Sequence, residues 1–158
     1  MNIFVLDTDV QACARAHYDR HVVKMCLEYA QILSTAARLR GFEHDGYRST
    51  HQNHPCVCWA AEEPRNWAWL YRLAQALGSE YSDRYGRVHA STLALQSLPT
   101  ELSERAAIRP DVPFNFVLAM PEEFQGDDPV EAYRAYYRKG KAHLIAYRAP
   151  AVVPSWLH

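Results

Sequence analysis

The stretch HYDRHVVKMCLEYAQ, residues 17–31, decides the fold because it has the character of a central helix. Apolar side chains cover most of its circumference, and a helix that is apolar nearly all round lies inside a protein. Polar residues nevertheless recur in it at steps of four, three, four and three, which aligns them along one side of a helix. This polar seam consists of His17, His21, Lys24, Glu28 and Gln31.

The polar seam has two possible explanations. It could be a solvated stripe held by a Lys24 to Glu28 ion pair, which stabilises an isolated helix by only about 0.2 to 0.5 kcal/mol. It could instead line a water-filled cleft, because an unpaired charge inside a protein costs several kcal/mol. We favour the pocket wall, so the seam becomes the first candidate for a functional site.

The flanking sequence predicts a mainly α fold in one compact domain, residues 1–158, with room for one short N-terminal strand, NIFVL. A hydrophobic content of 49% is enough for a single sizeable core in a chain of 158 residues. Caps, prolines and apolar periodicity set the expected elements. Helices are expected over 10–18, 19–39 and 64–86, with a short helix beginning at Pro55 and another helix beginning at Pro129. A loop is expected over 41–54, and irregular chain over 99–128, which includes Pro110.

The lengths of the apolar runs, the N-terminal sequence and the cysteine content indicate where the protein is located in the cell. The apolar runs are only a few residues long, far below the roughly 20 that a membrane helix needs, so no membrane association is expected. The N-terminus lacks a basic stretch followed by an apolar one, which predicts a cytoplasmic protein. The four cysteines show no disulfide framework, and we expect reduced thiols at Cys13, Cys26, Cys56 and Cys58.

The C-terminal fifth is locally basic although the whole chain has a formal net charge of −1. No acidic side chain follows Glu131, while tyrosines alternate with arginine and lysine. Cations suit phosphates and flat rings suit exposed bases, so this tail is a candidate nucleic-acid surface. Tyrosine-rich amphipathic helices also pack in cores, which is the alternative. The candidate DNA contacts here are Tyr137, Arg138 and Lys141.

Two further motifs carry candidate site residues. In GYRSTHQNHPC, residues 46–56, the side chains of His51, Asn53 and His54 could hold substrate oxygens or move protons near neutral pH. His54 could equally be a cap neighbour whose ring satisfies the backbone. In EYSDRYGRVH, residues 80–89, Arg84 and His89 could contact substrate, although Glu80 and Arg84 have the spacing of a plain ion pair.

These motifs together resemble a family of small phage and bacterial proteins that open with MNIF. The shared features are VVKM…E..Q.LSTA at 22–36, TH.NHP at 50–55 and EY..RYG..H at 80–89. More distantly, the layout is similar to the pyrimidine-dimer DNA glycosylases of the phage endonuclease type. In those enzymes a small N-terminal residue, exposed by Met removal, attacks with its amine beside a glutamate on the early helix. The resemblance aligns His21 with that glutamate, and Asn2 is too large for efficient Met removal.

Three classes of function follow. The first class is an enzyme acting on DNA bases or nucleotides, without a cofactor, of the N-glycosylase/lyase type that the resemblance implies. In it Lys24 or the Met1 amine is the expected nucleophile, and Glu28 and His21 move protons. His54 would join that catalytic group. The expected substrate contacts are His17, Arg20, Gln31, His51, Asn53, Arg84, His89, Tyr137, Arg138 and Lys141.

The second class is a zinc or iron enzyme, in which His17 and His21 supply an i, i+4 pair of ligands. His51, His54, His89 and Glu28 are the candidates for the remaining ligands. The third class is a nucleic-acid-binding module without catalysis. All three leave protein partners open.

Overall fold

The computed structural model describes residues 1–106 and 113–158. Within these ranges the chain is helical and contains no β-strand. The helices are α1 (Val10–Ala16), α2 (Asp19–Leu39), α3 (Pro55–Glu62), α4 (Pro64–Tyr85), α5 (Ala90–Ala94), α6 (Glu101–Glu104) and α7 (Pro129–Ala135). Short 3₁₀ or π turns span Leu95–Ser97, Glu122–Phe124, Tyr136–Gly140, Ala142–Leu144 and Ser155–Leu157. The mainly α prediction is confirmed, while the expectation for Pro110 lies outside the described residues.

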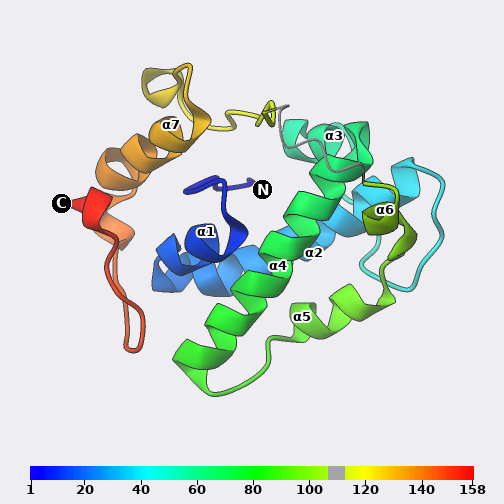
Figure 1. Ribbon diagram of the computed structural model, residues 1–158, viewed down its shortest axis with the longest axis horizontal. Coiled ribbons are helices and arrows are strands. Elements are labelled where there is room, and N and C mark those ends of the chain that lie inside the picture. Colours follow the sequence, from blue (N-terminus) through cyan, green and yellow to red (C-terminus); the bar gives the residue numbers. More distant parts are fainter. Residues whose placement is uncertain (107–112) are drawn as a thin grey trace.

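Helix α2 lies at the centre, as its apolar circumference predicts. It packs against α3, α4 and α5, while α1 packs against α4 (Figure 1). Helix α7 and the C-terminal segment lie on the other side of α1 from α6 (Figure 1). The four cysteines are free thiols, as expected. Among the described residues, none of the helices combines the length and apolar character needed to cross a membrane.

The N-terminal segment is buried and pairs with no other strand in the described chain. Helical side chains satisfy its backbone donors instead. The Phe4 N–H donates to the Tyr29 hydroxyl at 3.2 Å, and the Leu6 N–H donates to the Cys13 sulfur at 3.4 Å. The short strand predicted for residues 2–6 is therefore absent from the described structure. The apolar side chains of this segment are buried between helices, and a β-strand would also need a neighbouring extended segment as its hydrogen-bond partner.

The polar seam does not form one face, because the chain breaks between α1 and α2. His17 is the C-cap of α1 in an extended conformation, and α2 begins at Asp19. His21 lies in the first turn of α2, where Phe4 and Tyr137 cover it. Lys24 and Glu28, one and two turns later, are free of that cover, so only the C-terminal part of the seam reaches the surface.

The two buried histidines sit in a neutral hydrogen-bond network. His17 contacts the Cys13 carbonyl and the Tyr29 hydroxyl, each at 2.8 Å. The His21 ring contacts the hydroxyls of Tyr18 and Tyr137, each at 2.6 Å. Burial lowers the pKa of His17 to about 4 and that of His21 to about 2. Both rings are therefore neutral in the folded protein at ordinary pH.

This network predicts that the protein loses stability in mild acid. The unfolded histidines bind protons below about 6.5, whereas folded His17 does so only below about 4. Stability is therefore full above pH 6.5 and falls as the pH drops from 6.5 towards 4, with about 1.4 kcal/mol lost per unit of pKa difference. Urea unfolding between pH 7 and pH 5 isolates this window from the carboxylates. A free energy of unfolding that stays flat across that range would contradict the prediction.

Candidate active site

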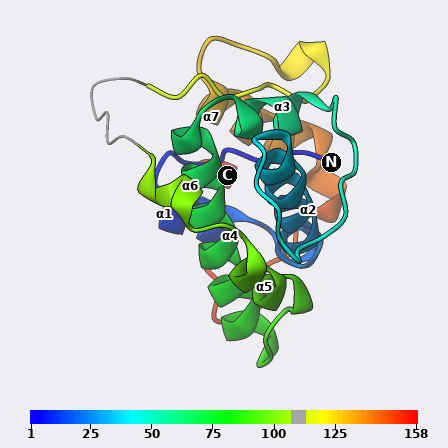
Figure 2. The same cartoon turned by 90° about the vertical axis from the view of Figure 1, so that its right-hand side faces the viewer.

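The N-terminal segment holds the Met1 amino group over the middle of α2, and Asn2 fixes its position. The Asn2 side-chain oxygen accepts from the Ile3 N–H at 2.7 Å and from the Tyr133 hydroxyl at 2.8 Å. The Asn2 amide nitrogen donates to the Ala119 carbonyl at 2.8 Å. All of the polar groups of this buried side chain are thus used to anchor the backbone beside α2, where Figure 2 places the N-terminus.

The Glu28 carboxylate joins the N-terminus to the seam. Its Oε2 atom lies 3.7 Å from the Met1 nitrogen and accepts the Asn2 N–H at 3.1 Å. Its Oε1 atom lies 3.3 Å from Lys24 Nζ. The Glu28 side chain is 13% exposed and the Lys24 side chain is 64% exposed. A partly buried carboxylate therefore lies between the N-terminal amine and an exposed lysine side chain.

A groove of about 450 Å³ runs along this side of α2. One wall is α2 and the other comes from the 41–54 loop and the start of α5. The lining residues are Val23, Lys24, Leu27, Glu28, Gln31, Tyr47, His89, Ala90 and Ser91. The structure thus brings Lys24, Glu28, Gln31 and His89 of the predicted site together.

Hydrogen bonds hold the loop wall against α2. The Arg38 guanidinium donates to the carbonyls of Tyr47 and of His44, the latter at 2.9 Å. The Tyr47 hydroxyl meets Ser91 Oγ at 2.9 Å, which ties the loop to α5. Gly46 is required in this turn because a Cβ there would lie 2.8 Å from His44 Nδ1 and 2.9 Å from Ser34 Oγ. The groove is consequently preformed.

The TH.NHP turn lies near the amine. His54 caps α3, and its Nδ1 accepts the Cys56 N–H at 3.2 Å. Burial lowers the pKa of His54, and the nearby Met1 amine and His51 lower it further. His51 and Asn53 are exposed, and His51 has a left-handed backbone conformation with φ 49°. The expected grouping of His51, Asn53 and His54 is therefore a surface turn beside the N-terminus.

Several predicted site residues lie elsewhere. His17, His21 and Tyr137 are buried in the network described above, at 0%, 5% and 0% exposure. His21, aligned with the family glutamate in the sequence, does not reach the amine, and Glu28 stands there instead. The reason is that the first turn of α2 is covered by the N-terminal segment and by Tyr137.

Arg84 is an internal residue whose guanidinium has no exposed surface. It donates to Asp19 at 3.1 Å, to Glu80 at 2.6 Å and to the His17 carbonyl at 2.9 Å. The Glu80 to Arg84 pair expected from the spacing is present. Arg84 therefore joins α4 to the α1–α2 junction rather than facing a substrate.

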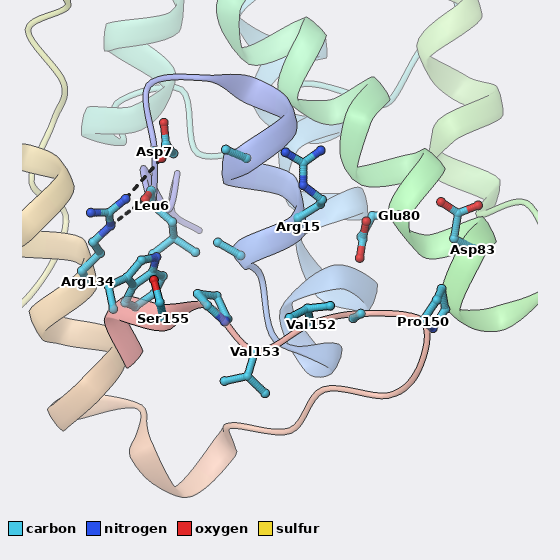
Figure 3. A pocket seen from close by; sticks show the side chains of 15 residues that line it. Leu6, Asp7, Arg15, Glu80, Asp83, Arg134, Pro150, Val152, Val153 and Ser155 are labelled. Atoms are coloured by element: carbon cyan, nitrogen blue, oxygen red, sulfur yellow. Dashed lines mark hydrogen bonds and ion pairs between the residues drawn. The ribbon is translucent and has the colours of Figure 1, made fainter. Parts of the chain in front are cut away.

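The basic tail is mostly engaged by the protein itself. Arg138 donates to the Trp156 carbonyl, and Lys141 lies over the Tyr136 ring. Arg134 binds Asp7 and the Leu6 carbonyl at the edge of a second cavity of about 820 Å³ (Figure 3). Arg20, in contrast, is exposed on the first turn of α2. Of the tail residues expected to contact DNA, Tyr137 is buried and Arg138 and Lys141 contact protein groups, whereas the neighbouring Lys139 and Arg148 are exposed.

The metal alternative lacks a ligand set. Both ring nitrogens of His17 and of His21 already contact protein groups. Within residues 1–106 and 113–158, no group of three or more histidine, cysteine, aspartate or glutamate side chains is arranged to hold a metal ion. The helix break before Asp19 is the physical cause, because it turns the expected i, i+4 pair into rings from two different elements.

The sequence did not predict three residues of the site. Asn2 anchors the N-terminus, and Tyr47 and Ser91 form the wall of the groove opposite α2. Tyr47 belongs to the GY motif, so a signal for it existed. Asn2 was considered only as an obstacle to Met removal. Its three partners are separated from it by one, 117 and 131 positions in the sequence, and such long-range contacts leave no local pattern.

The sequence profile of the pyrimidine dimer DNA glycosylase family matches residues 1–94, which is more than half of the 158 residues. The matched part contains Glu28, Lys24 and both walls of the groove. No curated protein and no solved structure matches the chain. The distant resemblance to the pyrimidine-dimer DNA glycosylases is confirmed: the chain belongs to the pyrimidine dimer DNA glycosylase family.

Proposed function

We propose that the protein is a DNA repair enzyme of the cytoplasm that removes a damaged base as an N-glycosylase and then cleaves the strand as a lyase. The nucleophile in this proposal is the Met1 amine. The observation that carries it is the 3.7 Å approach of that amine to Glu28 Oε2 beside a preformed groove. Family membership supports DNA as the substrate.

The amine is a better nucleophile than Lys24 on chemical grounds. Only a neutral amine attacks, and α-amino groups as a class have a pKa of about 7.7 to 8.0, against about 10.4 for lysine side chains. The Lys24 side chain is also 64% exposed, and its Nζ lies 3.3 Å from Glu28 Oε1. We assign Lys24, with exposed Arg20, to the DNA phosphates.

The proposed steps use Glu28, which lines the groove, and the Met1 amine, which lies 3.7 Å from it. The amine forms a bond to C1′ of the deoxyribose, the base leaves with the electrons of the glycosidic bond, and Glu28 accepts the proton lost by nitrogen. Departure of O4′ from C1′, with a proton, leaves an imine between protein and sugar. Loss of a C2′ proton then expels the 3′ phosphate. Glu28 is placed to accept protons because its Oε2 already faces the amine.

Borohydride trapping tests this assignment, because it reduces the imine to a stable amine. With duplex DNA containing an abasic site or a pyrimidine dimer, we expect a covalent adduct that maps by mass spectrometry to the N-terminal peptide. Chemical acetylation of the α-amine should abolish it, whereas Lys24→Ala should retain it and weaken DNA binding. An adduct on Lys24 would transfer the nucleophile to that residue. DNA binding without any adduct would indicate a binding module.

A further inference from the structure

Two histidines, His89 in the groove and His54 near the Met1 amine, each cap a helix with the side-chain ring. His54 Nδ1 accepts the Cys56 N–H at 3.2 Å, and His89 Nδ1 accepts the Ser91 N–H at 3.1 Å. A neutral imidazole has one bare nitrogen and one N–H. Since Nδ1 is the acceptor in both rings, the proton lies on Nε2. Each ring therefore presents a hydrogen-bond donor at the end opposite its cap.

The position of the His89 ring is fixed on two sides. Its cap holds Nδ1, and the ring packs edge-on against Tyr81 with 4.8 Å between centroids. It lines the same groove as Lys24 and Glu28. Burial lowers its pKa, and the Arg87 guanidinium lowers it further, so the ring stays neutral. A donor held in one orientation is suited to positioning a ligand.

We propose that His54 and His89 position DNA by donating their Nε2–H groups to phosphate oxygens, and that neither acts as an acid or base. This inference rests on the proposed function. Action as a base would need a bare Nε2 and hence a proton on Nδ1, where it would face the backbone N–H of Cys56 or Ser91. The cap would then be lost.

Phosphate is the favoured partner because two cations, Arg87 and Lys24, lie on the His89 side of the groove, which the Glu28 carboxylate lines as well. Arg87 lies close enough to His89 to influence its charge, and Lys24 lines the same groove. His54 is near both the Met1 amine and the Glu28 carboxylate, and its Nε2–H would reach a phosphate next to the sugar that the amine attacks. A phosphate oxygen accepts from neutral and charged donors alike, and its negative charge complements these cations. The two rings would thus set the register of the strand around the amine.

Replacing each histidine by asparagine tests the Nε2–H donor separately from the helix cap. It is among the best N-cap residues, so His89→Asn and His54→Asn keep a cap acceptor but remove the Nε2–H. The matched variants His89→Ala and His54→Ala remove both. We expect each Asn variant to keep a higher Tm than its Ala counterpart. Each Asn variant should bind duplex DNA carrying a tetrahydrofuran abasic analogue about 10- to 100-fold more weakly than wild type, the effect of one hydrogen bond to a charged group. The Ala variants should lose Tm as well.

Kinetics and a modified substrate sharpen the test. In multiple-turnover cleavage of abasic duplex the Asn variants should raise KM with little change in kcat, because the chemical groups remain. In a second test, each phosphate of the DNA is replaced in turn by an uncharged methylphosphonate. For each histidine, the replacement at one phosphate should weaken binding by the wild type but not by the matching Asn variant. If both Asn variants bind and react like wild type, the inference is overturned; a fall in kcat alone would also overturn it, because it would indicate proton transfer. If wild type forms no adduct but the binding differences persist, only the proposed chemistry fails.

Discussion

Glu28→Gln is expected to slow formation of the borohydride-trapped adduct by about 10²- to 10⁴-fold, the contribution typical of a general acid or base. The amide keeps the shape of the side chain and an oxygen that can accept the Asn2 N–H, now at 3.1 Å from Oε2. It cannot take the proton that the attacking amine must lose. Single-turnover trapping on abasic duplex, with protein in excess, measures the rate directly.

The control for Glu28→Gln is Glu43→Gln, which neutralises an exposed carboxylate in the 41–54 loop. Its adduct should form at the wild-type rate. Affinity for the tetrahydrofuran duplex should not fall in Glu28→Gln, because removing a negative charge beside Lys24 does not oppose phosphate binding. Wild-type trapping by Glu28→Gln would remove the carboxylate from the mechanism while leaving the amine as nucleophile.

Arg84→Met is expected to lower the free energy of unfolding by about 3 to 5 kcal/mol, the cost of breaking a buried ion pair from one side. Its loss leaves Asp19 and Glu80, which are 19% and 13% exposed, without their cation. The His17 carbonyl also loses a donor at 2.9 Å. Methionine keeps much of the apolar stem, so the loss reports on the charge and its hydrogen bonds.

Urea unfolding at pH 7 measures that loss, and Arg72→Met is the matched control on the same helix. Arg72 is exposed, so its replacement should change stability by no more than about 0.5 kcal/mol. Adducts formed by Arg84→Met below its unfolding transition should still map to the N-terminal peptide, because Arg84 does not line the groove. Equal stability of the two variants would mean that the Arg84 network contributes little.

The sequence by itself determined α1–α4, α7 and the family, but it did not predict α5, and α6 lies in the stretch 99–128 expected to be irregular. Asp9, Pro55, Pro64, Asp128 and Gly86 occupy helix ends as their chemistry predicts. The core helix 19–39 follows from apolar periodicity, and its observed bounds are Asp19–Leu39. These signals are local, because a cap or a periodic pattern acts within a few residues of itself. The Lys24 to Glu28 pair is local for the same reason.

Only the tertiary structure decided which polar residues face the groove. On a helical projection His21 and Glu28 lie on nearly the same side of α2, yet one is buried by Phe4 and Tyr137 and the other meets the Met1 amine. Periodicity gives the direction of a side chain but not what covers it. That cover comes from segments more than 100 residues away in sequence, such as Tyr137 on His21 and Tyr133 on Asn2, and long-range packing of this kind has no local sequence pattern.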